Sequence, residues 1–348
     1  MTIDIKHEIC DFTCMWNGLE DIYRNKTLLK IPQHFFFGLS GFCNFVYMNF
    51  NNTEIPKLVY WNDGRPKKMY EFMGEKVGFS CSFIESRTFK HTMNVLKDEI
   101  NRGNPVIIGS LDMFYLEYLT KFYHKNHIPI HYVLVVGYDD DKKQIMLYDC
   151  SREEIQTLSY ENLEKAWNVN VQGLSKKNTL YKFLFSSDLN DIKSIFYSSL
   201  EKKYKLNIYA PVNFVGVKGL RKLAKDIMLW EQQLEKSTYK KCLLHLVEYT
   251  GFPPSLPDRK KLPEVRHTGV RHEFASLLKW GAKEYNEPLF LQSSEMFKKS
   301  GKYIEDLSYR IYDIAEGRQK MSNIIKDILE EISSTELKAF QYIEQVFQ

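Results

Sequence analysis

The segment from Pro129 to Asp149 restricts the fold of this chain more than any other, because it carries two strand-like runs around a short polar turn. The first run, 131–138, is rich in β-branched and aromatic residues, and the second covers 144–149. The acidic cluster at 139–142 between them is typical of a hairpin turn. The sequence therefore predicts an antiparallel β-hairpin.

This hairpin predicts a specific side-chain pair. With the turn centred near Asp140, His131 lies opposite Asp149, and directly opposed residues have Cβ atoms about 5 Å apart. A carboxylate there accepts a hydrogen bond from one imidazole nitrogen and leaves the other nitrogen free as a base. Each residue alone is more often structural than catalytic. Because the register points both at one spot, we interpret them as a base and its orienting group.

The candidate nucleophiles lie near the start of the chain, where residues 10–23 show the apolar spacing of an amphipathic helix. Cys10 is expected at or just before the first turn, where the helix dipole favours a thiolate. Cys14 is expected one turn further in, where the dipole effect is weaker. The alternative for either cysteine is a buried structural thiol.

Composition excludes several functional classes. The 348 residues include 48 basic and 44 acidic side chains, a balance that argues against a nucleic-acid partner. No apolar run approaches the ~18 residues that span a bilayer, and the first residues lack a signal-peptide core, so we expect a cytoplasmic protein. The six cysteines show no CxxC spacing, so we expect neither a zinc site or other metal site nor a disulfide framework.

Two domains are expected. Residues 1–185 mix helix and strand patterns, whereas from 188 onward the apolar spacing is helical almost throughout, most clearly at 293–333. The fold class is therefore α+β, with an all-helical C-terminal domain over 186–348. Within the first domain the patterns predict strands at 105–111 and 181–185 and helices at 88–101, 113–123 and 159–167.

The chain places a cysteine on an early helix and then a histidine and an aspartate on paired strands. This order resembles that of the papain-like proteases. The short His131–Asp149 spacing is similar to that of the C39 peptidases. A closer resemblance is to the N-terminal domain of the butirosin biosynthesis protein H family, and four sequence blocks carry it. The helical half resembles the domain of unknown function that usually follows this domain, most clearly at 271–278. The four blocks are 10–19, 37–47, 103–118 and 131–149.

The resemblance implies a papain-like acyltransferase. The family pattern has cysteine, then threonine three residues on and leucine nine residues on, which selects Cys10 over Cys14 through Thr13 and Leu19. The implied reaction moves an acyl or aminoacyl group from an acyl carrier protein thioester to a small-molecule amine or hydroxyl acceptor, in secondary metabolism such as antibiotic biosynthesis. No cofactor is implied, because the phosphopantetheine arm arrives on the carrier. The helical domain is a candidate cover or acceptor-binding domain.

Two alternatives stay open, a C39-like cysteine peptidase or amidase and a non-catalytic binding protein on the same scaffold. The chain also departs from the family pattern in two places. Gln33 stands where the family often has glutamate, and the glutamine that binds the oxyanion in papain-like enzymes is missing. The oxyanion donor is therefore unassigned, with the backbone N–H of Cys10 as one contributor.

Further residues are candidates for binding. Gly38 and Gly41 interrupt an aromatic run, which indicates backbone close to a ligand or, as the more common reason, to a neighbouring element. With them, Asp112 and Tyr115 in the third block are our candidates for substrate contacts. Because carrier proteins are acidic, we expect a docking surface of basic residues. Its first candidates are Arg65, Lys67 and Lys68.

Overall fold

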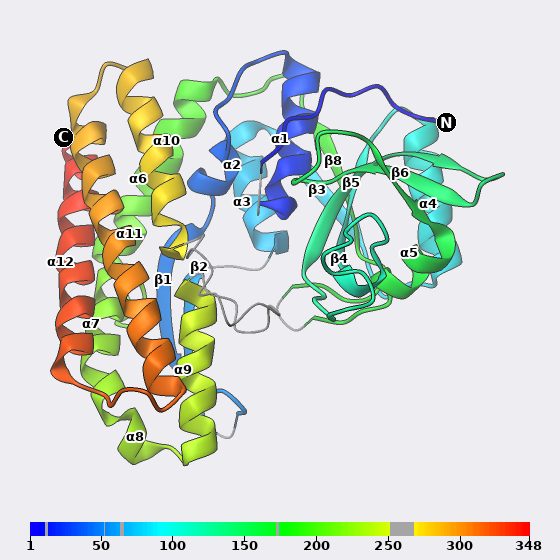
Figure 1. The fold of residues 1–348 in the computed structure, drawn as a ribbon. Helices are drawn as coiled ribbons and strands as arrows, with labels where there is room; N and C mark the ends of the chain where they lie inside the picture. The colour runs from blue at the N-terminus through cyan, green and yellow to red at the C-terminus, as the bar shows by residue number, and fades with distance from the viewer. Residues whose placement is uncertain (11–12, 52, 63–65, 172–173, 251–267) are drawn as a thin grey trace. The chain divides into compact units, whose positions relative to one another are not determined.

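The computed structural model describes residues 1–348 except 11–12, 52, 63–65, 172–173 and 251–267 (Figure 1). The chain forms two compact units. The first comprises residues 1–37 and 64–192, and the second comprises 38–63 and 193–348. An α+β unit built on a sheet and a largely helical unit are thus both present, which confirms the predicted fold class. No described helix has the length and apolar character needed to cross a membrane.

The first unit is built on a six-stranded antiparallel sheet in the order β3-β8-β4-β5-β6-β7. The predicted hairpin is its β5–β6 pair. Four strands match the predicted runs to within one residue at each end: 105–111, 131–138, 144–149 and 181–185. The strands are β3 (Phe79–Ile84), β4 (Val106–Leu111), β5 (His131–Asp139), β6 (Gln144–Tyr148), β7 (Gln156–Ser159) and β8 (Leu180–Phe185).

Helices cover both faces of this sheet. Val133 and Val135 belong to the core cluster beneath α4 and α5, whereas Leu134 points the other way. A Cβ placed on Gly18 of α1 lies 3.0 Å from Leu134 Cβ, so α1 packs tightly on that second face because residue 18 has no side chain. The helices of this unit are α1 (Cys14–Thr27), α3 (Pro66–Val77), α4 (Phe89–Asn101) and α5 (Tyr160–Trp167).

Two of the three helices predicted within residues 88–167 are confirmed, and each has a side-chain cap at its start. The hydroxyl of Thr88 accepts from the His91 N–H at the start of α4, and that of Ser159 accepts from the Asn162 N–H at the start of α5. The helix predicted over 113–123 is wrong. Only the 3₁₀ turn η1 (Met113–Tyr115) forms, and the rest of the segment is made of turns.

The second unit combines helices with a two-stranded sheet, β1 (Phe42–Asn49) and β2 (Lys57–Asn62). This sheet lies inside the residue range predicted for the first domain, and the second unit is therefore not purely helical. Its helices are α6 (Ile192–Tyr209), α7 (Gly216–Asp226), α8 (Trp230–Gln233), α9 (Lys236–Thr250), α10 (Arg271–Glu284), α11 (Pro288–Ala315) and α12 (Asn323–Gln345), with 3₁₀ turns η2 (Ile227–Leu229) and η3 (Thr268–Val270). The short α2 (Phe35–Leu39) joins the two units.

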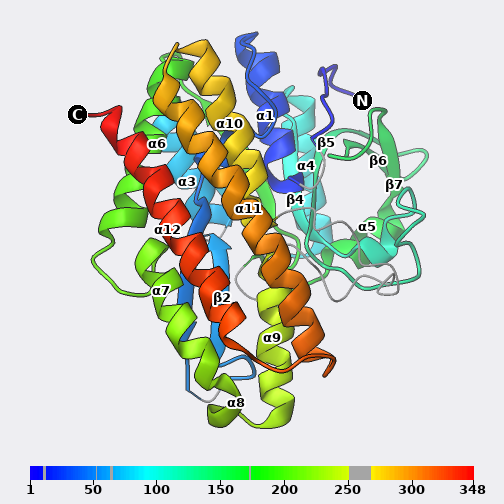
Figure 2. The same ribbon diagram turned by 60° about the vertical axis from the view of Figure 1, so that its left-hand side comes forward.

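Apolar burial explains why the segment 38–63 belongs to the second unit. Phe45, Tyr47 and Val59 are fully buried in one core cluster with residues of α7, α9, α11 and α12. Figure 2 shows α11 and α12 side by side in this unit. Gly317, in the connection between the two helices, takes a positive φ. The chain therefore enters the second unit twice, near residues 38 and 193, rather than once near 185.

Candidate active site

The helix that carries the candidate nucleophile begins at Cys14, not at Cys10 as predicted. Thr13 is the N-cap residue, and its carbonyl accepts from the N–H groups of Trp16 and Asn17 at 2.8 and 2.9 Å. Its hydroxyl turns away from the helix and donates to the Cys10 carbonyl at 3.1 Å. The dipole argument made for Cys10 therefore applies to Cys14, which is the first residue of α1.

The side chains of His131 and Asp149 meet, with Nε2 of the histidine 2.5 Å from Oδ2 of the aspartate. The register that led to this pairing was wrong. Leu134 pairs with Tyr148 across the hairpin, and a bulge between Val135 and Gly137 shifts the alignment. Asp149 follows the last residue of β6 and lies diagonal to His131. The imidazole ring is large enough to span a diagonal separation.

Asp149 is held by several donors besides His131. Its Oδ1 accepts from the N–H and the hydroxyl of Ser151 at 2.9 and 2.7 Å, and its Oδ2 accepts from the Tyr118 hydroxyl at 3.0 Å. The carboxylate is fully buried. Burial alone raises the pKa of Asp149, but the charge and hydrogen bond of His131 and the Ser151 donors outweigh it and hold that pKa well below its usual range.

Cys14 interacts with the His131 side chain, with the Cys150 thiol and with the backbone of Tyr132. The hydrogen bond from Cys150 has the largest effect on the pKa of Cys14. Burial opposes it, and the hydrogen bond and positive charge of His131 add to it. The result is a pKa well below that of an ordinary thiol.

The imidazole of His131 shows the matching shift. Burial lowers the pKa of His131, but the negative charge of Asp149, its hydrogen bond and the interactions with Cys14 outweigh burial and raise it to about 10. Both shifts favour a thiolate on Cys14 paired with an imidazolium on His131.

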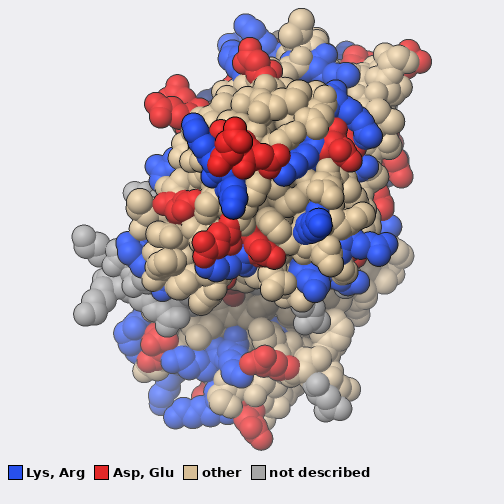
Figure 3. All heavy atoms as spheres, turned by 90° about the vertical axis from the view of Figure 1, so that its right-hand side faces the viewer, with Lys and Arg blue, Asp and Glu red and all other residues tan. Residues whose placement is uncertain are grey.

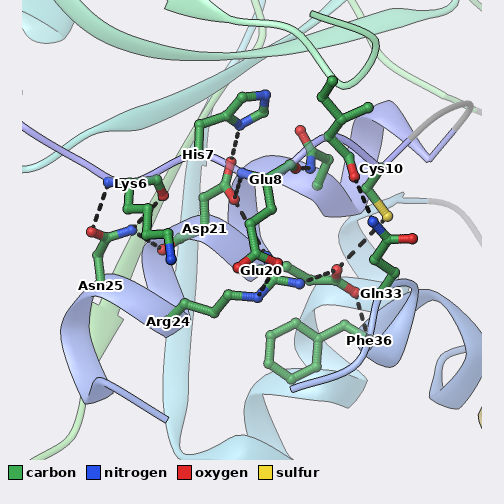
Figure 4. Close-up of polar contacts among 12 residues, drawn as sticks. Lys6, His7, Glu8, Cys10, Glu20, Asp21, Arg24, Asn25, Gln33 and Phe36 are labelled. Atoms are coloured by element: carbon green, nitrogen blue, oxygen red, sulfur yellow. Dashed lines mark hydrogen bonds and ion pairs between the residues drawn. The ribbon is translucent and has the colours of Figure 1, made fainter. Parts of the chain in front are cut away.

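Cys10 has a different environment, and Figure 4 shows Glu20 on the side of its sulfur. Its Sγ lies 3.1 Å from Nδ1 of His34 and 3.9 Å from Oε2 of Glu20, and it accepts from the Thr13 hydroxyl at 3.2 Å. Burial and the nearby Glu20 carboxylate raise the pKa of Cys10 to about 12. The structure thus joins His131 and Asp149 with Cys14, whereas the sequence pattern had selected Cys10.

Comparison with known proteins adds one observation to this geometry. Residues 13–150 match the model of the family described as butirosin biosynthesis protein H, N-terminal. This match supports a likeness of the segment to the butirosin protein H-like family. The match includes Cys14, His131 and Asp149 and begins after Cys10. The matched family suggests a biosynthetic enzyme with an acyltransferase-like role. No curated protein matches the chain.

Asp112, a candidate substrate contact, has a structural role in this domain. Its Oδ1 accepts from the N–H groups of Phe114 and Ile128, and its Oδ2 lies 2.6 Å from Nδ1 of His127. Asp112 therefore ties together the two ends of the loop that leads to β5. Tyr115 lies in the same loop with its ring edge toward His127.

The two glycines of the family's second block lie in the second unit. A Cβ on Gly38 falls 2.6 Å from Leu277 Cδ2, so this glycine permits close packing against α10. Gly41 is buried next to β1. For Gly38, packing of a neighbouring element is thus a sufficient reason for the glycine.

The candidate docking lysines both have acidic partners. Lys67 Nζ lies 2.5 Å from Oε2 of Glu85, and Lys68 Nζ lies 2.9 Å from Oε2 of Glu71. Arg65 lies outside the described residues. On the face in Figure 3, basic and acidic side chains are interspersed over most of the surface. The sets of three His, Cys, Asp or Glu residues that hold metal ions are absent from the described part of the chain.

Four residues of this site were missed by the sequence reasoning: Cys150, Tyr118, Ser151 and His7. Cys150 and Ser151 directly follow Asp149, and proximity in sequence to a candidate carboxylate was the available signal. Tyr118 belongs to the third family block but had no assigned role. For His7 the sequence carried no pattern, because its contacts in the structure are with residues 21, 149 and 152.

Proposed function

We propose that this protein is a cysteine-dependent acyltransferase whose nucleophile is Cys14, with His131 as general acid and base and Asp149 as the group that orients it. The observation that supports this most is the cluster itself: Cys14 opens a helix and interacts with His131, and His131 is hydrogen-bonded to Asp149 at 2.5 Å. The donor is an acyl or aminoacyl thioester on an acyl carrier protein, and the acceptor is a small-molecule amine or hydroxyl.

The first half-reaction is acylation. The Cys14 thiolate attacks the thioester carbonyl carbon, and the negative charge moves to the carbonyl oxygen. When the tetrahedral intermediate collapses, the bond to the carrier's sulfur breaks, and the His131 imidazolium gives its proton to the departing thiolate. An acyl-enzyme and a neutral imidazole remain.

The second half-reaction returns the enzyme to its starting state. The acceptor amine attacks the acyl-enzyme carbonyl, neutral His131 takes a proton from the amine nitrogen, and Cys14 departs as the thiolate. Asp149 stabilises the imidazolium at the beginning and end of this cycle. Because the carbonyl oxygen carries charge in both intermediates, an N–H donor must face it.

We assign that oxyanion contact to the backbone N–H of Cys14. The N–H of Cys10, the contributor considered from sequence, already donates to the Cys150 carbonyl at 3.0 Å. The N–H of Cys14 belongs to the first turn of α1, where Thr13 makes no side-chain cap. Backbone N–H groups there have no acceptor within the helix.

The test is acyl-enzyme formation from a loaded carrier protein, read by mass spectrometry of the intact chain and its peptides. Wild type and Cys10→Ala should gain the acyl mass on the peptide that contains Cys14, and Cys14→Ala should gain none. An adduct on Cys10 would overturn the assignment. Asp149→Asn should slow acylation on the order of 10⁴-fold, as the equivalent change does in serine proteases.

The second candidate is a cysteine peptidase or amidase, favoured by the same cluster and by the papain-like arrangement of helix and sheet. Thioester and matched amide donors carrying one acyl group separate the two. The acyltransferase should react with the thioester and give the acylated amine rather than the free acid. Efficient hydrolysis of the amide would favour the peptidase.

Carrier docking is the part of this proposal with the least structural support. Lys67 and Lys68 already pair with glutamates, so reversing their charges should raise the apparent Michaelis constant for the carrier-bound donor only severalfold, and added salt should remove the effect. Lys165, which pairs with Glu161 on α5, is the matched control. Equal effects of Lys67→Glu and Lys165→Glu would place docking elsewhere.

A further inference from the structure

His7 lies between the two parts of the first unit that carry the proposed nucleophile and its orienting carboxylate. Its Nδ1 is 2.6 Å from Oδ2 of Asp21 on α1. Its Nε2 is 3.2 Å from the carbonyl oxygen of Asp149 and 2.9 Å from that of Arg152. The ring stacks on Tyr148 with centroids 4.5 Å apart. The His7 side chain thus connects α1 to the turn at 149–152, in addition to the contacts of Cys150 with Cys14 and with the Cys10 N–H.

The partners of the ring determine its protonation state. Both nitrogens of His7 face acceptors, a carboxylate on one side and two carbonyls on the other. Beside an ionised Asp21, a neutral imidazole has one N–H, so either tautomer leaves a lone pair directed at an oxygen. Burial raises the pKa of Asp21, and the hydrogen bond and charge of His7 oppose that rise. The imidazolium has an N–H for each side. The side chains of His7 and Asp21 are 2% and 0% exposed, so water does not relieve that conflict.

The charged groups around the ring favour the same state. Burial lowers the pKa of His7, but the hydrogen bond and charge of Asp21 and the two carbonyls outweigh it and raise the pKa above its usual value. Asp21 also accepts from Arg24 of α1 at 3.4 Å, and Arg24 in turn pairs with Glu20 and Glu8. Tyr148 contributes its aromatic face.

The chain segment that carries His7 is itself fastened to α1 (Figure 4). The Lys6 N–H donates to the Asn25 side chain at 2.8 Å, and the same side chain donates to the Lys6 carbonyl at 2.7 Å. Asn17 donates to the Glu8 carbonyl at 2.8 Å. These contacts hold the segment on the helix, but they do not extend to the turn at 149–152.

We infer that His7 is a positioning residue which, as an imidazolium held by Asp21, sets the turn that carries Asp149 against the helix that carries Cys14. The inference rests on the proposed acyl transfer for its effect on rate. Its physical basis is that Asp149 is held at both ends: its carboxylate orients His131, while its carbonyl accepts from His7. A small displacement of this turn moves His131 relative to the thiolate.

The sign of the pH dependence follows from the raised pKa of His7. The charged contact is complete below that pKa and is lost as the pH rises through it. The pair of Cys14 and His131 stays charged up to a pKa of about 10 for His131. Below pH 10, a decrease in acylation rate toward alkaline pH is therefore expected from His7.

The experiment compares wild type with His7→Gln, Asp21→Asn and the control Asn25→Ala, which removes the Lys6 contacts and a hydrogen bond to the Asp21 carbonyl but leaves the contacts of the His7 ring in place. Acyl-enzyme formation is followed against pH, and hydrogen exchange is followed in the peptide that covers 149–152. His7→Gln should slow acylation roughly ten- to a hundredfold, lose the alkaline decrease and exchange faster at the Arg152 amide, which donates to the Asp149 carbonyl. Asn25→Ala should resemble wild type.

Asp21→Asn keeps the imidazole and should move the alkaline decrease to lower pH, so the inference stays testable if His7→Gln folds poorly. Rates, pH profiles and exchange that are equal in wild type, His7→Gln and Asp21→Asn would overturn the positioning role. If no variant forms an acyl-enzyme but His7→Gln still accelerates exchange and changes the pH profile of Cys14 alkylation, the proposed function fails while the positioning role holds.

Discussion

Two cysteines four residues apart have opposite chemical character in this protein. Cys10 and Cys14 both lie near the start of α1, yet the pKa of the first is raised to about 12 and that of the second falls well below its usual value. Burial raises the pKa of Cys10 and the charge of Glu20 adds to it, whereas Asp149 maintains a positive charge on His131 beside Cys14. The donors and charges around each sulfur, rather than its distance in sequence from the helix, separate the two pKa values.

The largest test of this comparison removes each sulfur in turn. Cys14→Ala should lose acyl transfer on the order of 10⁴-fold or more, because no other group replaces the nucleophile. Cys10→Ala should keep most of the activity and lose only packing. The measurement is the initial rate of acylation at saturating donor, with thermal unfolding of both variants as the control for folding. A reversal of the two results would exchange the roles of the cysteines.

The second test uses alkylation by iodoacetamide against pH, with peptide mapping. Wild-type Cys14 should react at pH values well below those of a free thiol, and Cys10 should stay unmodified at neutral pH. His131→Ala should move the Cys14 profile to higher pH, since the hydrogen bond and charge of His131 disappear. A Cys14 profile that does not respond to His131→Ala would contradict the ion pair.

A smaller effect is expected from Cys150, whose hydrogen bond has the largest influence on the pKa of Cys14. Cys150→Ala should raise that pKa while His131 continues to favour the thiolate, so acylation should slow mainly at acidic pH. Titration of the thiolate by its ultraviolet absorbance measures the shift. Cys150→Ser, which keeps a donor, is the matched control and should restore most of the difference.

The smallest effect concerns Glu20, on the Cys10 side of the comparison. Glu20→Gln removes a negative charge near Cys10 and should lower the pKa of that thiol, although burial still raises it. Burial likewise raises the pKa of Glu20 itself to about 7, so the difference should appear above neutral pH, where this carboxyl is ionised. Alkylation of Cys10 in Glu20→Gln should increase slightly at alkaline pH, with no change at Cys14.

Much of the first unit could be predicted from local patterns. The β5–β6 hairpin, the strands β4 and β8, and the capped helices α4 and α5 follow from apolar periodicity and cap residues, which act between neighbours in sequence. The pairing of His131 with Asp149 also followed from the hairpin, despite the error in register. That error came from the turn, which was placed near Asp140 but is centred between Asp141 and Lys142, because Asp139 pairs with Gln144. The bulge changes the alignment by only one residue.

The sequence by itself therefore determined the fold class, the hairpin and the histidine–aspartate pair. The tertiary structure decided the rest, because it depends on contacts between distant segments. Such contacts decided that α1 starts at Cys14 and that residues 38–63 belong to the second unit. They also placed the charges that separate the two thiols and linked His7 to residues 149 and 152. Charge and burial act through space, and only the folded chain brings His131 beside Cys14.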